Sequence, residues 1–391
     1  MKVPKLRFRD DDGREFPEWK EKTLEEIASI ERGKFSVRPR NDPRYFGGNI
    51  PFAQTGDVVS SDLFLKKFNQ TLNEEGLKVS KLFPKNTILI TIAANIGNTA
   101  ITNFEIACTD SIVAIQPFRE QAIPVWLKYT LDTKKEELDS KATQNAQKNI
   151  NLQVLRPLVL VTPSLEEQTK IANFLTAIDE KITQLTQKCD LLAQYKKGVM
   201  QQIFSQKLRF KDDDGREFPE WEEATLGDLF NIKAGGDISQ ENVSQKKDEI
   251  YKYPIFANSD KNFGLYGYSN QFKVNSDAIT VTGRGNLGIA IPRFEPFYPI
   301  VRLLILIPKT KFNIYFGASA INKLDFFVES TGVPQLTAPQ LSSFSIKFPI
   351  YEEQTKIANF LTAIDDKITQ AQAQLEAVKR YKKGLLQQMF V

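Results

Sequence analysis

The side chains that most often carry acid–base or nucleophilic catalysis are scarce in this sequence. It contains no histidine and only two cysteines, Cys108 and Cys189. The lack of histidine excludes serine–histidine and cysteine–histidine catalysis, and also histidine-ligated metal centres. Cys108 lies in a strand-like run and Cys189 at an apolar position of a helical pattern. We therefore interpret both as small buried hydrophobic residues rather than as a disulfide or a metal site.

Three short motifs suggest chemistry that their context does not support. Residues 283–288 match G-x-G-x-x-G, but a strand-like run follows where a dinucleotide site needs a helix, so we predict a tight inter-strand turn. Residues 41–45 (NDPRY) lack the second proline of the D-P-P-Y type signature of amino-methyltransferases. The DDD runs at 10–12 and 212–214 read as solvated turns. We predict no catalytic residue, metal site or cofactor in this chain.

Cationic and amide side chains cluster among turn-forming residues, and these are the types that contact DNA. Lysine and arginine neutralise phosphates, whereas arginine, lysine, asparagine and glutamine read base edges. Each side chain alone fits a solvated surface, but the set favours DNA contact. Arg284 leads, because a guanidinium on a tight turn can reach guanine O6 and N7, and Arg38 and Arg40 suit phosphates. The candidates are Arg38, Arg40, Arg44, Lys148, Asn149, Asn258, Lys261, Arg284 and Gln335.

Two blocks of the sequence occur twice in almost identical form. Residues 5–19 (KLRFRDDDGREFPEW) and 207–221, which we call the frame segments, match at fourteen of fifteen positions with an offset of 202. Residues 166–184 (EEQTKIANFLTAIDEKITQ) and 352–370 match at eighteen of nineteen positions with an offset of 186. The tails YKKGVMQQIF and YKKGLLQQMF keep the same offset. Because the first tail runs directly into the second frame segment, we expect the C-terminus to lie beside the first.

The segments between these blocks differ, although they share a faint plan. Residues 91–101 (TIAANIGNTAI) resemble residues 280–291 (TVTGRGNLGIAI), with Asn95 and Gly97 aligned to Asn286 and Gly288. Gln335 occupies the position equivalent to Asn149. The two variable segments differ in sequence but are expected to share one fold, and each lies between duplicated blocks. This arrangement favours a protein that recognises two different targets in the same orientation.

Each EEQTKIANF block begins a long helix with a heptad pattern. Apolar residues recur in steps of three and four, with Lys196 and Lys382 at the one polar position of each seam. A helix of this length spans roughly 58 Å, and the other copy is its natural partner, so we predict an antiparallel two-helix coiled coil. Ser164 and Glu167 are placed to form a capping box. Gly198 and Gly384 could mark a kink, a helix end or a close backbone approach.

Composition limits the class of protein. Hydrophobic residues make up 41% of the 391 residues, which supports packed cores, and the net charge of +4 leaves room only for local basic patches. No run approaches the roughly 18 apolar residues of a membrane span, and the charged N-terminus does not resemble a signal peptide. We expect a cytoplasmic protein without membrane contact.

The duplicated blocks and the two unlike inserts resemble the specificity subunit of type I restriction–modification enzymes. The resemblance extends over essentially the whole chain. It implies an α/β (α+β) fold with two globular target recognition domains separated by two long helices, and a pseudo-two-fold internal repeat. The expected domains are residues 1–163, 164–206 (first spacer helix), 207–349 and 350–391 (second spacer helix).

The resemblance also implies a function. Each recognition domain would read one half of a bipartite, asymmetric site in double-stranded DNA, and the helices would set the spacer. Two modification subunits carrying S-adenosylmethionine would dock on the scaffold and methylate adenine N6. Restriction subunits would add ATP- and Mg²⁺-dependent cleavage. Phe174, Tyr195, Phe360 and Tyr381 flank the seams in both copies and are candidate partner contacts, although packing on the adjacent domain explains them as well.

Two rival functions remain open from the sequence. One is a coiled-coil adaptor that binds proteins and never touches DNA. The other is a self-contained methyltransferase or nuclease. The missing cofactor loop argues against the enzyme, and the basic, amide-rich turns argue against the adaptor.

Overall fold

The computed structural model divides the chain into two compact units. It describes residues 4–35, 37, 39–142, 148–326 and 334–390. The first unit contains Met1–Gln187 and Gln372–Val391, and the second contains Lys188–Ala371. Each unit therefore holds one frame segment, one variable segment and a part of each long helix.

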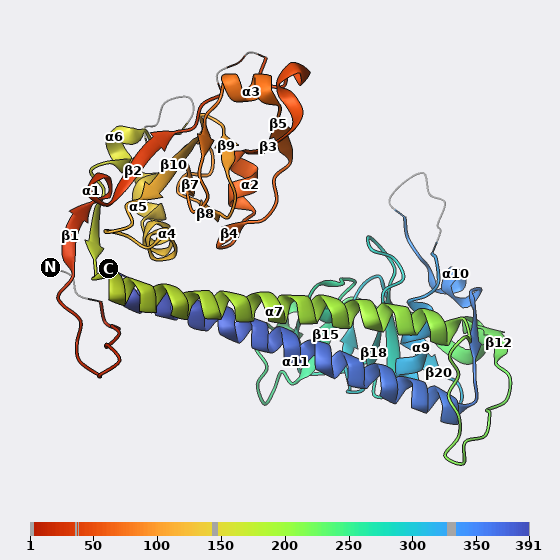
Figure 1. The fold of residues 1–391 in the computed structure, drawn as a ribbon. Helices are drawn as coiled ribbons and strands as arrows, with labels where there is room; N and C mark the ends of the chain where they lie inside the picture. The colour runs from red at the N-terminus through yellow and green to blue at the C-terminus, as the bar shows by residue number, and fades with distance from the viewer. Residues whose placement is uncertain (1–3, 36, 38, 143–147, 327–333, 391) are drawn as a thin grey trace. The chain divides into compact units, whose positions relative to one another are not determined.

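The two repeated blocks form long helices, α7 (Leu165–Phe204) and α11 (Tyr351–Met389). In the first unit the start of α7 packs with the end of α11, through Ile171 and Leu175 against Leu385. In the second unit the end of α7 packs with the start of α11, through Ile203 and Leu361. This arrangement makes the pair antiparallel, as Figure 1 shows and as the heptad pattern predicts. The apolar residues of the predicted seams are all buried or half-buried. They are Ile171, Leu175, Ile178, Ile182, Leu185, Cys189, Leu192, Val199 and Ile203 in α7, and Ile357, Leu361, Ile364, Ile368, Ala371, Leu375, Val378, Leu385 and Met389 in α11.

The helix starts and the helical glycines refine the predictions from sequence. The backbone N–H of Glu167 donates to Ser164 Oγ over 3.3 Å, which confirms the cap. In a complete capping box the backbone N–H of Ser164 would donate to the Glu167 carboxylate. Here that carboxylate accepts from Arg7 and Trp19 instead. Gly198 and Gly384 lie inside continuous helices, and a Cβ atom at either would meet open space. Neither glycine is a helix end, and neither approaches another described segment of the chain closely.

The variable part of the first unit is built on two mixed sheets. The larger has the strand order β2-β10-β7-β8-β4, and the smaller has the order β5-β3-β9-β6. Helix α4 (Pro124–Thr133) has a buried face containing Trp126 and Leu127, which join the main core of this unit. The strands are β2 (Ala28–Arg32), β3 (Phe46–Ala53), β4 (Phe64–Leu65), β5 (Gln70–Leu72), β6 (Leu82–Phe83), β7 (Ile88–Thr91), β8 (Thr99–Thr102), β9 (Ile106–Cys108) and β10 (Ile112–Pro117).

Short helices and one further strand pair complete the first unit. β1 and β11 pair in antiparallel fashion, so the entry and exit of the variable segment lie side by side. These elements are β1 (Lys20–Thr23), α1 (Leu24–Ile27), η1 (Pro43–Tyr45), α2 (Thr55–Val59), α3 (Glu74–Lys78), α5 (Lys135–Ser140), α6 (Leu152–Leu155) and β11 (Val159–Thr162).

The second unit repeats this plan, which confirms that the two unlike segments share a fold. Its main sheet has the order β13-β20-β17-β18, matching β2-β10-β7-β8, and β12 pairs with β21 as β1 pairs with β11. A second sheet has the order β14-β16-β15-β19. The strands are β12 (Glu222–Thr225), β13 (Phe230–Ala234), β14 (Val243–Ser244), β15 (Tyr253–Phe256), β16 (Leu265–Ser269), β17 (Ala278–Thr282), β18 (Ala290–Arg293), β19 (Tyr298–Pro299), β20 (Leu303–Pro308) and β21 (Ser345–Phe348).

The helices of the second unit are fewer than those of the first in the described residues. Helix α9 lies against β17 and β18 and is buried along most of its length. The short helices of this unit are α8 (Leu226–Leu229), η2 (Gln240–Asn242), η3 (Lys261–Gly264), α9 (Ile314–Ile321) and α10 (Ala338–Ser342).

The frame segments fasten each variable domain to its helix. In the first unit Arg7 binds Glu167, with Nη2 to Oε2 at 2.7 Å, and also donates to the carbonyls of Phe16 and Pro17. Arg209 makes the equivalent contacts to Glu353, Phe218 and Pro219 in the second unit. Both glutamates are fully buried.

The expected closure at the C-terminus is present. The backbone N–H of Leu6 donates to the carbonyl of Gln388 over 3.0 Å. Leu208 donates in the same way to Gln202 over 3.1 Å, although there the chain is continuous. The break between the termini and the covalent connection at residue 205 therefore occupy equivalent places in the two units.

Candidate nucleic-acid interface

The glycine-rich motif forms the predicted tight turn between β17 and β18. Thr282 Oγ1 donates to the carbonyl of Asn286 at 2.5 Å, and Ile289 N–H donates back to the same hydroxyl at 3.0 Å. Gly285 and Gly288 have φ of 75° and 80°, a region that favours glycine. A strand follows the motif, as expected, rather than the helix that a dinucleotide site requires.

A second loop fixes the conformation of this turn. The side-chain oxygen of Asn258 accepts from Gly283 N–H at 2.6 Å and from Arg284 N–H at 3.1 Å, while its amide donates to the Arg284 carbonyl at 2.7 Å. Asn286 Nδ2 donates to Asp260 at 2.7 Å, and this bond holds the pKa of Asp260 below its usual value. Asn258, chosen from sequence as a base-reading residue, thus uses its side chain to hold the backbone at Arg284.

Arg284 and Gln335 meet at this turn. They form an isolated antiparallel bridge, and the N–H of Leu336 donates to the Gly283 carbonyl at 2.8 Å. Gln335 and Lys261 are exposed, and Arg284 is half-buried. The structure therefore brings together Asn258, Lys261, Arg284 and Gln335 from three separate parts of the second variable segment.

The first unit contains the same turn with different side chains. Thr91 holds it as Thr282 does, through the Asn95 carbonyl and the Asn98 N–H. Ala93 bridges Asn149, and Ile150 N–H donates to the Ile92 carbonyl at 3.0 Å. The predicted equivalence of Asn149 and Gln335 is confirmed. The alignment of Asn95 and Gly97 with Asn286 and Gly288 is also confirmed, because Thr91 and Thr282 hold the two turns at the same offset.

The remaining basic candidates of the first unit take part in ion pairs. Arg40 contacts Asp110 at 3.2 Å, Arg44 contacts Asp42 at 2.6 Å, and Lys148 contacts Asp139 at 2.5 Å. All three cations are exposed, so these pairs are weak and a phosphate can compete for the cation. Arg38 lies outside the described residues.

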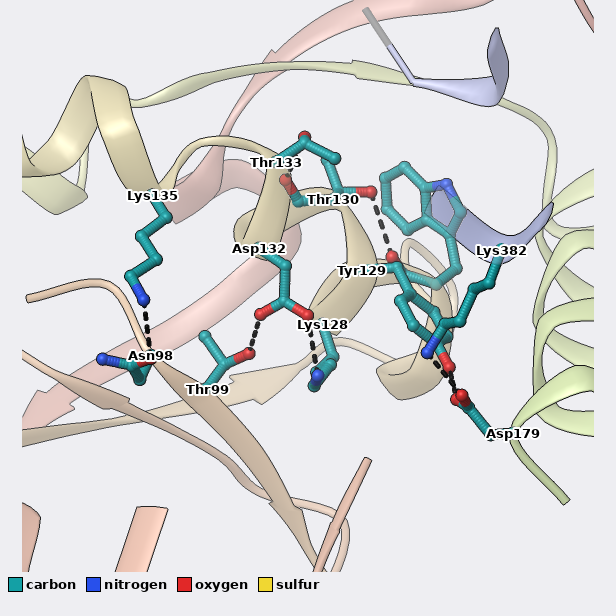
Figure 2. Close-up of polar contacts among 11 residues, drawn as sticks. Asn98, Thr99, Lys128, Tyr129, Thr130, Asp132, Thr133, Lys135, Asp179 and Lys382 are labelled. Carbon is teal, nitrogen blue, oxygen red and sulfur yellow. Dashed lines mark hydrogen bonds and ion pairs between the residues drawn. The ribbon is translucent and has the colours of Figure 1, made fainter. Parts of the chain in front are cut away.

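A polar contact joins each variable domain to the coiled coil, and the sequence reading missed most of it. In the first unit Asp179 of α7 accepts from Tyr129 of α4 and pairs with Lys382 of α11 (Figure 2). In the second unit Asp365 of α11 accepts from Tyr315 of α9 and pairs with Lys196 of α7 at 2.6 Å. The polar seam positions Lys196 and Lys382 are therefore neutralised by an aspartate of the other helix. Burial and the bond to Asp365 raise the pKa of Tyr315.

The two tyrosines reach these aspartates from different turns of their helices. Tyr129 follows the N-cap Ile123 by six positions, whereas Tyr315 follows the N-cap Asn313 by two. The N–H groups of both N-caps donate to an equivalent glutamine, Gln168 or Gln354. The same domain-to-helix contact is thus made by two unlike sequences.

A groove lies between α4 and the coiled coil in the first unit. Its volume is about 1080 Å³, and Lys66, Lys67, Asn98, Lys135 and Lys379 are among its lining residues. Figure 2 shows Lys135 donating to Asn98, and Asp132 placed between Thr99 and Lys128. Three lysines of this wall, Lys128, Lys135 and Lys382, are occupied by these internal contacts.

Comparison with known proteins assigns the chain to a family. The model of the type I restriction modification DNA specificity domain matches residues 17–193 and again residues 219–380. This chain belongs to the type I DNA specificity family. The two matches coincide with the two variable segments and the starts of the helices that follow them, in agreement with the resemblance noted from sequence.

Relatives in this family cover the chain to different extents. A putative type I specificity subunit of Mycoplasma pneumoniae is 32% identical over 209 residues, which are 54% of this chain and 56% of the relative. The specificity subunit of the type I restriction enzyme MjaIX from Methanocaldococcus jannaschii is 22% identical over 97% of this chain and 94% of its own length. The aligned part of the first relative is therefore little more than half of that protein.

Solved structures of the specificity family share the fold. The crystal structure of the S subunit of a type I restriction-modification system from M. genitalium matches with a TM-score of 0.67 and 17% identity, covering 100% of this chain and 99% of that one. A chain from a type I restriction-modification complex matches with a TM-score of 0.57 and 15% identity, covering 96% and 98%. At these identities the likeness concerns the fold alone.

The aromatic candidates for partner contact in this specificity chain fall into two pairs. Phe174 packs edge-on against Phe8 and Phe360 against Phe210, with ring centroids 5.5 and 5.6 Å apart. These phenylalanines pack on the frame segments. This agrees with the interpretation that they pack within the chain and not with the one that they contact a partner. Tyr195 and Tyr381 are 52% and 57% exposed. Of these four candidates, the two tyrosines are the exposed ones.

No group of three or more cysteine, aspartate or glutamate side chains is arranged to hold a metal ion in the part of the chain that the structure describes. Within the same residues no helix combines the length and apolar character needed to cross a membrane.

Proposed function

We propose that this chain is the non-catalytic, sequence-reading subunit of a type I restriction–modification enzyme. Each variable domain reads one half of a bipartite, asymmetric site in double-stranded DNA. The observation that carries this proposal is one turn built twice with different side chains. Ala93 and Asn149 occupy it in the first unit, and Arg284 and Gln335 in the second. One scaffold with two chemistries suits two different half-sites.

The contacts with DNA follow from the chemistry of these side chains, which are cations and amides. Arg284 and Gln335 read base edges in one half-site, and Asn149 does so in the other, because guanidinium and amide groups pair with purine edges in the major groove. Lys261, Lys148, Arg38, Arg40 and Arg44 supply phosphate contacts. Asn258 holds the Arg284 turn and contributes to reading through it.

The partners of this chain supply the chemistry. We propose that two modification subunits, which bind S-adenosylmethionine, dock on the two equivalent helix surfaces that carry Tyr195 and Tyr381 and methylate adenine N6. Restriction subunits use ATP and Mg²⁺. The helices α7 and α11 each run through both units, so their length sets the spacer between the half-sites.

The decisive test is single-molecule methylation sequencing of DNA from cells that express this chain with its neighbouring modification subunit. Matched cells lack only this chain. A split, asymmetric N6-methyladenine motif should be present in the first sample and missing from the second. An unchanged methylation pattern would sink the proposal, and binding of the assembled complex to random duplexes would then separate an inactive specificity subunit from an adaptor.

A further inference from the structure

A short loop of the second unit has an unusual backbone. Asn262, Phe263 and Gly264 follow one another with φ of 47°, 51° and 78°. Glycine suits this region, and a Cβ atom at Gly264 would lie 2.9 Å from the Ala257 carbonyl oxygen. A bulky aromatic residue is strongly disfavoured there. Among the described non-glycine residues with positive φ, Phe263 is the one aromatic, so surrounding contacts must hold it in place.

A buried arginine provides that hold. Arg293 Nη2 donates to the Phe263 carbonyl at 2.6 Å, and its Nε donates to Thr280 Oγ1 at 3.0 Å. Its guanidinium lies 3.5 Å from the ring centroid of Phe256. Burial lowers the pKa of Arg293 to about 10. Burying a guanidinium is unfavourable unless it is bonded, and here the bonds fix the backbone of Phe263.

The ring of Phe263 itself points to solvent and is 72% exposed. The same loop carries Asn258 and Asp260, which bind the turn containing Arg284. The backbone of Phe263 is therefore held in the same loop that fixes the backbone of Arg284, the strongest base-reading candidate. An exposed apolar ring is stabilised when it packs against another apolar group and leaves water. The major groove of DNA presents one such group, the 5-methyl of thymine.

We propose that Phe263 contacts the 5-methyl group of a thymine next to the base pair read by Arg284. This inference rests on the proposed function and adds a specificity-determining residue to it. Insertion of the ring between base pairs is the other way in which phenylalanine acts on DNA, but such wedges work mainly from the minor groove. Arg284 reads guanine O6 and N7 from the major groove, so Phe263 faces the methyl group instead.

The test uses the full chain assembled with its modification subunits. Each thymine of the half-site read by the second domain, on either strand, is replaced singly by deoxyuridine, which lacks the methyl group. The wild-type complex should bind one substituted duplex about fourfold more weakly, which corresponds to about 0.8 kcal/mol for one methyl-sized group. Phe263→Ala should bind the thymine and deoxyuridine duplexes equally, and Phe263→Leu should retain part of the preference.

Phe294→Ala is the matched control, because Phe294 is 64% exposed but lies outside the left-handed segment. It should behave as wild type. The inference is overturned if no deoxyuridine substitution causes a loss of binding affinity that depends on Phe263. It is equally overturned if the half-site contains no thymine on either strand. It is also overturned if binding makes 2-aminopurine beside the contacted base fluoresce in a Phe263-dependent way, since that reports insertion. Binding without any sequence preference would instead remove the proposed function itself.

Discussion

At the scale of single residues, the cations of this chain differ in what holds them. Arg284 is half-buried with its backbone fixed by Asn258, whereas Lys261 is exposed at the start of the loop that contains Phe263. Arg7 and Arg209 are committed to buried glutamates of the helices. A basic residue in this sequence can therefore read a base, neutralise a phosphate or fasten a domain, and its neighbours decide which.

The first prediction separates base reading from phosphate contact. Arg284→Ala should lose discrimination at one position of one half-site, by about 1–3 kcal/mol, because a bidentate contact disappears. Lys261→Ala should weaken binding to all sequences and lower the salt slope by about one. The measurement is binding of the assembled complex to half-site variants over a range of salt concentrations. Arg216→Ala, an exposed frame residue, is the control. A uniform loss for Arg284→Ala would show that this residue does not read sequence.

The second prediction concerns the two frame arginines. Arg209→Met should lower the free energy of unfolding by about 3 kcal/mol or more, because it leaves Glu353 buried and unpaired. Arg7→Met should cost less, since Trp19 Nε1 still donates to Glu167 at 2.9 Å, whereas Trp221 Nε1 has no hydrogen-bond partner in the described residues. Thermal denaturation of both variants measures the difference. Equal losses would contradict this account.

The third prediction is a pH dependence. Burial raises the pKa of the Cys108 thiol to about 12, against about 9.0 for an exposed thiol. Its contribution to stability is thus fully present below pH 9 and is lost as pH rises towards 12, because only the unfolded chain ionises there. Denaturant unfolding from pH 8 to 11 should show a shallower decline in Cys108→Ala than in wild type. A decline that is equally steep in both proteins would contradict this prediction.

At the scale of elements, the two long helices are continuous at the positions where the sequence allowed a kink or a helix end. Gly198 and Gly384 interrupt no helix, and the polar positions Lys196 and Lys382 pair with aspartates of the opposite helix. Each aspartate also accepts from a tyrosine of the adjacent domain. These contacts join helix to helix and domain to helix at one point in each unit.

The fourth prediction follows from the two helical glycines. Gly198→Ala and Gly384→Ala should each stabilise the isolated chain by up to about 1 kcal/mol, because alanine is the better helix former and space is open at both sites. Denaturant unfolding measures the gain. Association with the modification subunit is measured in parallel, since a weakened complex would identify these positions as places where the partner backbone comes close. A loss of stability in the isolated chain would contradict the prediction.

At the scale of the whole molecule, the chain is built from two equivalent assemblies, each with a frame, a domain and parts of both helices. The Leu6–Gln388 and Leu208–Gln202 bonds occupy the same place in each. A frame segment thus meets the end of a long helix in the same way at both junctions, one of which is covalently continuous.

The fifth prediction is a circular permutant. Residues 1 and 391 are joined by a short linker, and new ends are made between Gln206 and Lys207, where Gln206 has a φ of 59° and leaves the helix. It should fold and direct methylation of the same motif as wild type, because the non-covalent bond between Leu208 and Gln202 remains available. A chain opened inside α7 at Gly198 is the control and should fail. A changed motif in the first permutant would refute the equivalence.

Much of the architecture was determined by the sequence alone. The duplicated blocks, the heptad seams, the inter-strand turn and the match of Asn149 to Gln335 are periodic or local signals, and the structure confirms them. Such signals can be recognised in the linear sequence because they depend only on spacing along the chain. The frame segments were recognised as repeats, and the bond between Leu6 and Gln388 follows from their order.

The use of individual polar side chains was decided only by the tertiary structure. Glu167 looked like part of a capping box but binds Arg7 and Trp19, and Asn258 looked like a base reader but holds the Arg284 turn. Phe174 packs on Phe8, and Asp179 meets Lys382 from more than two hundred residues away. A hydrogen bond or ion pair depends on which groups folding brings within about 3 Å. Spacing along the chain carries no record of that distance.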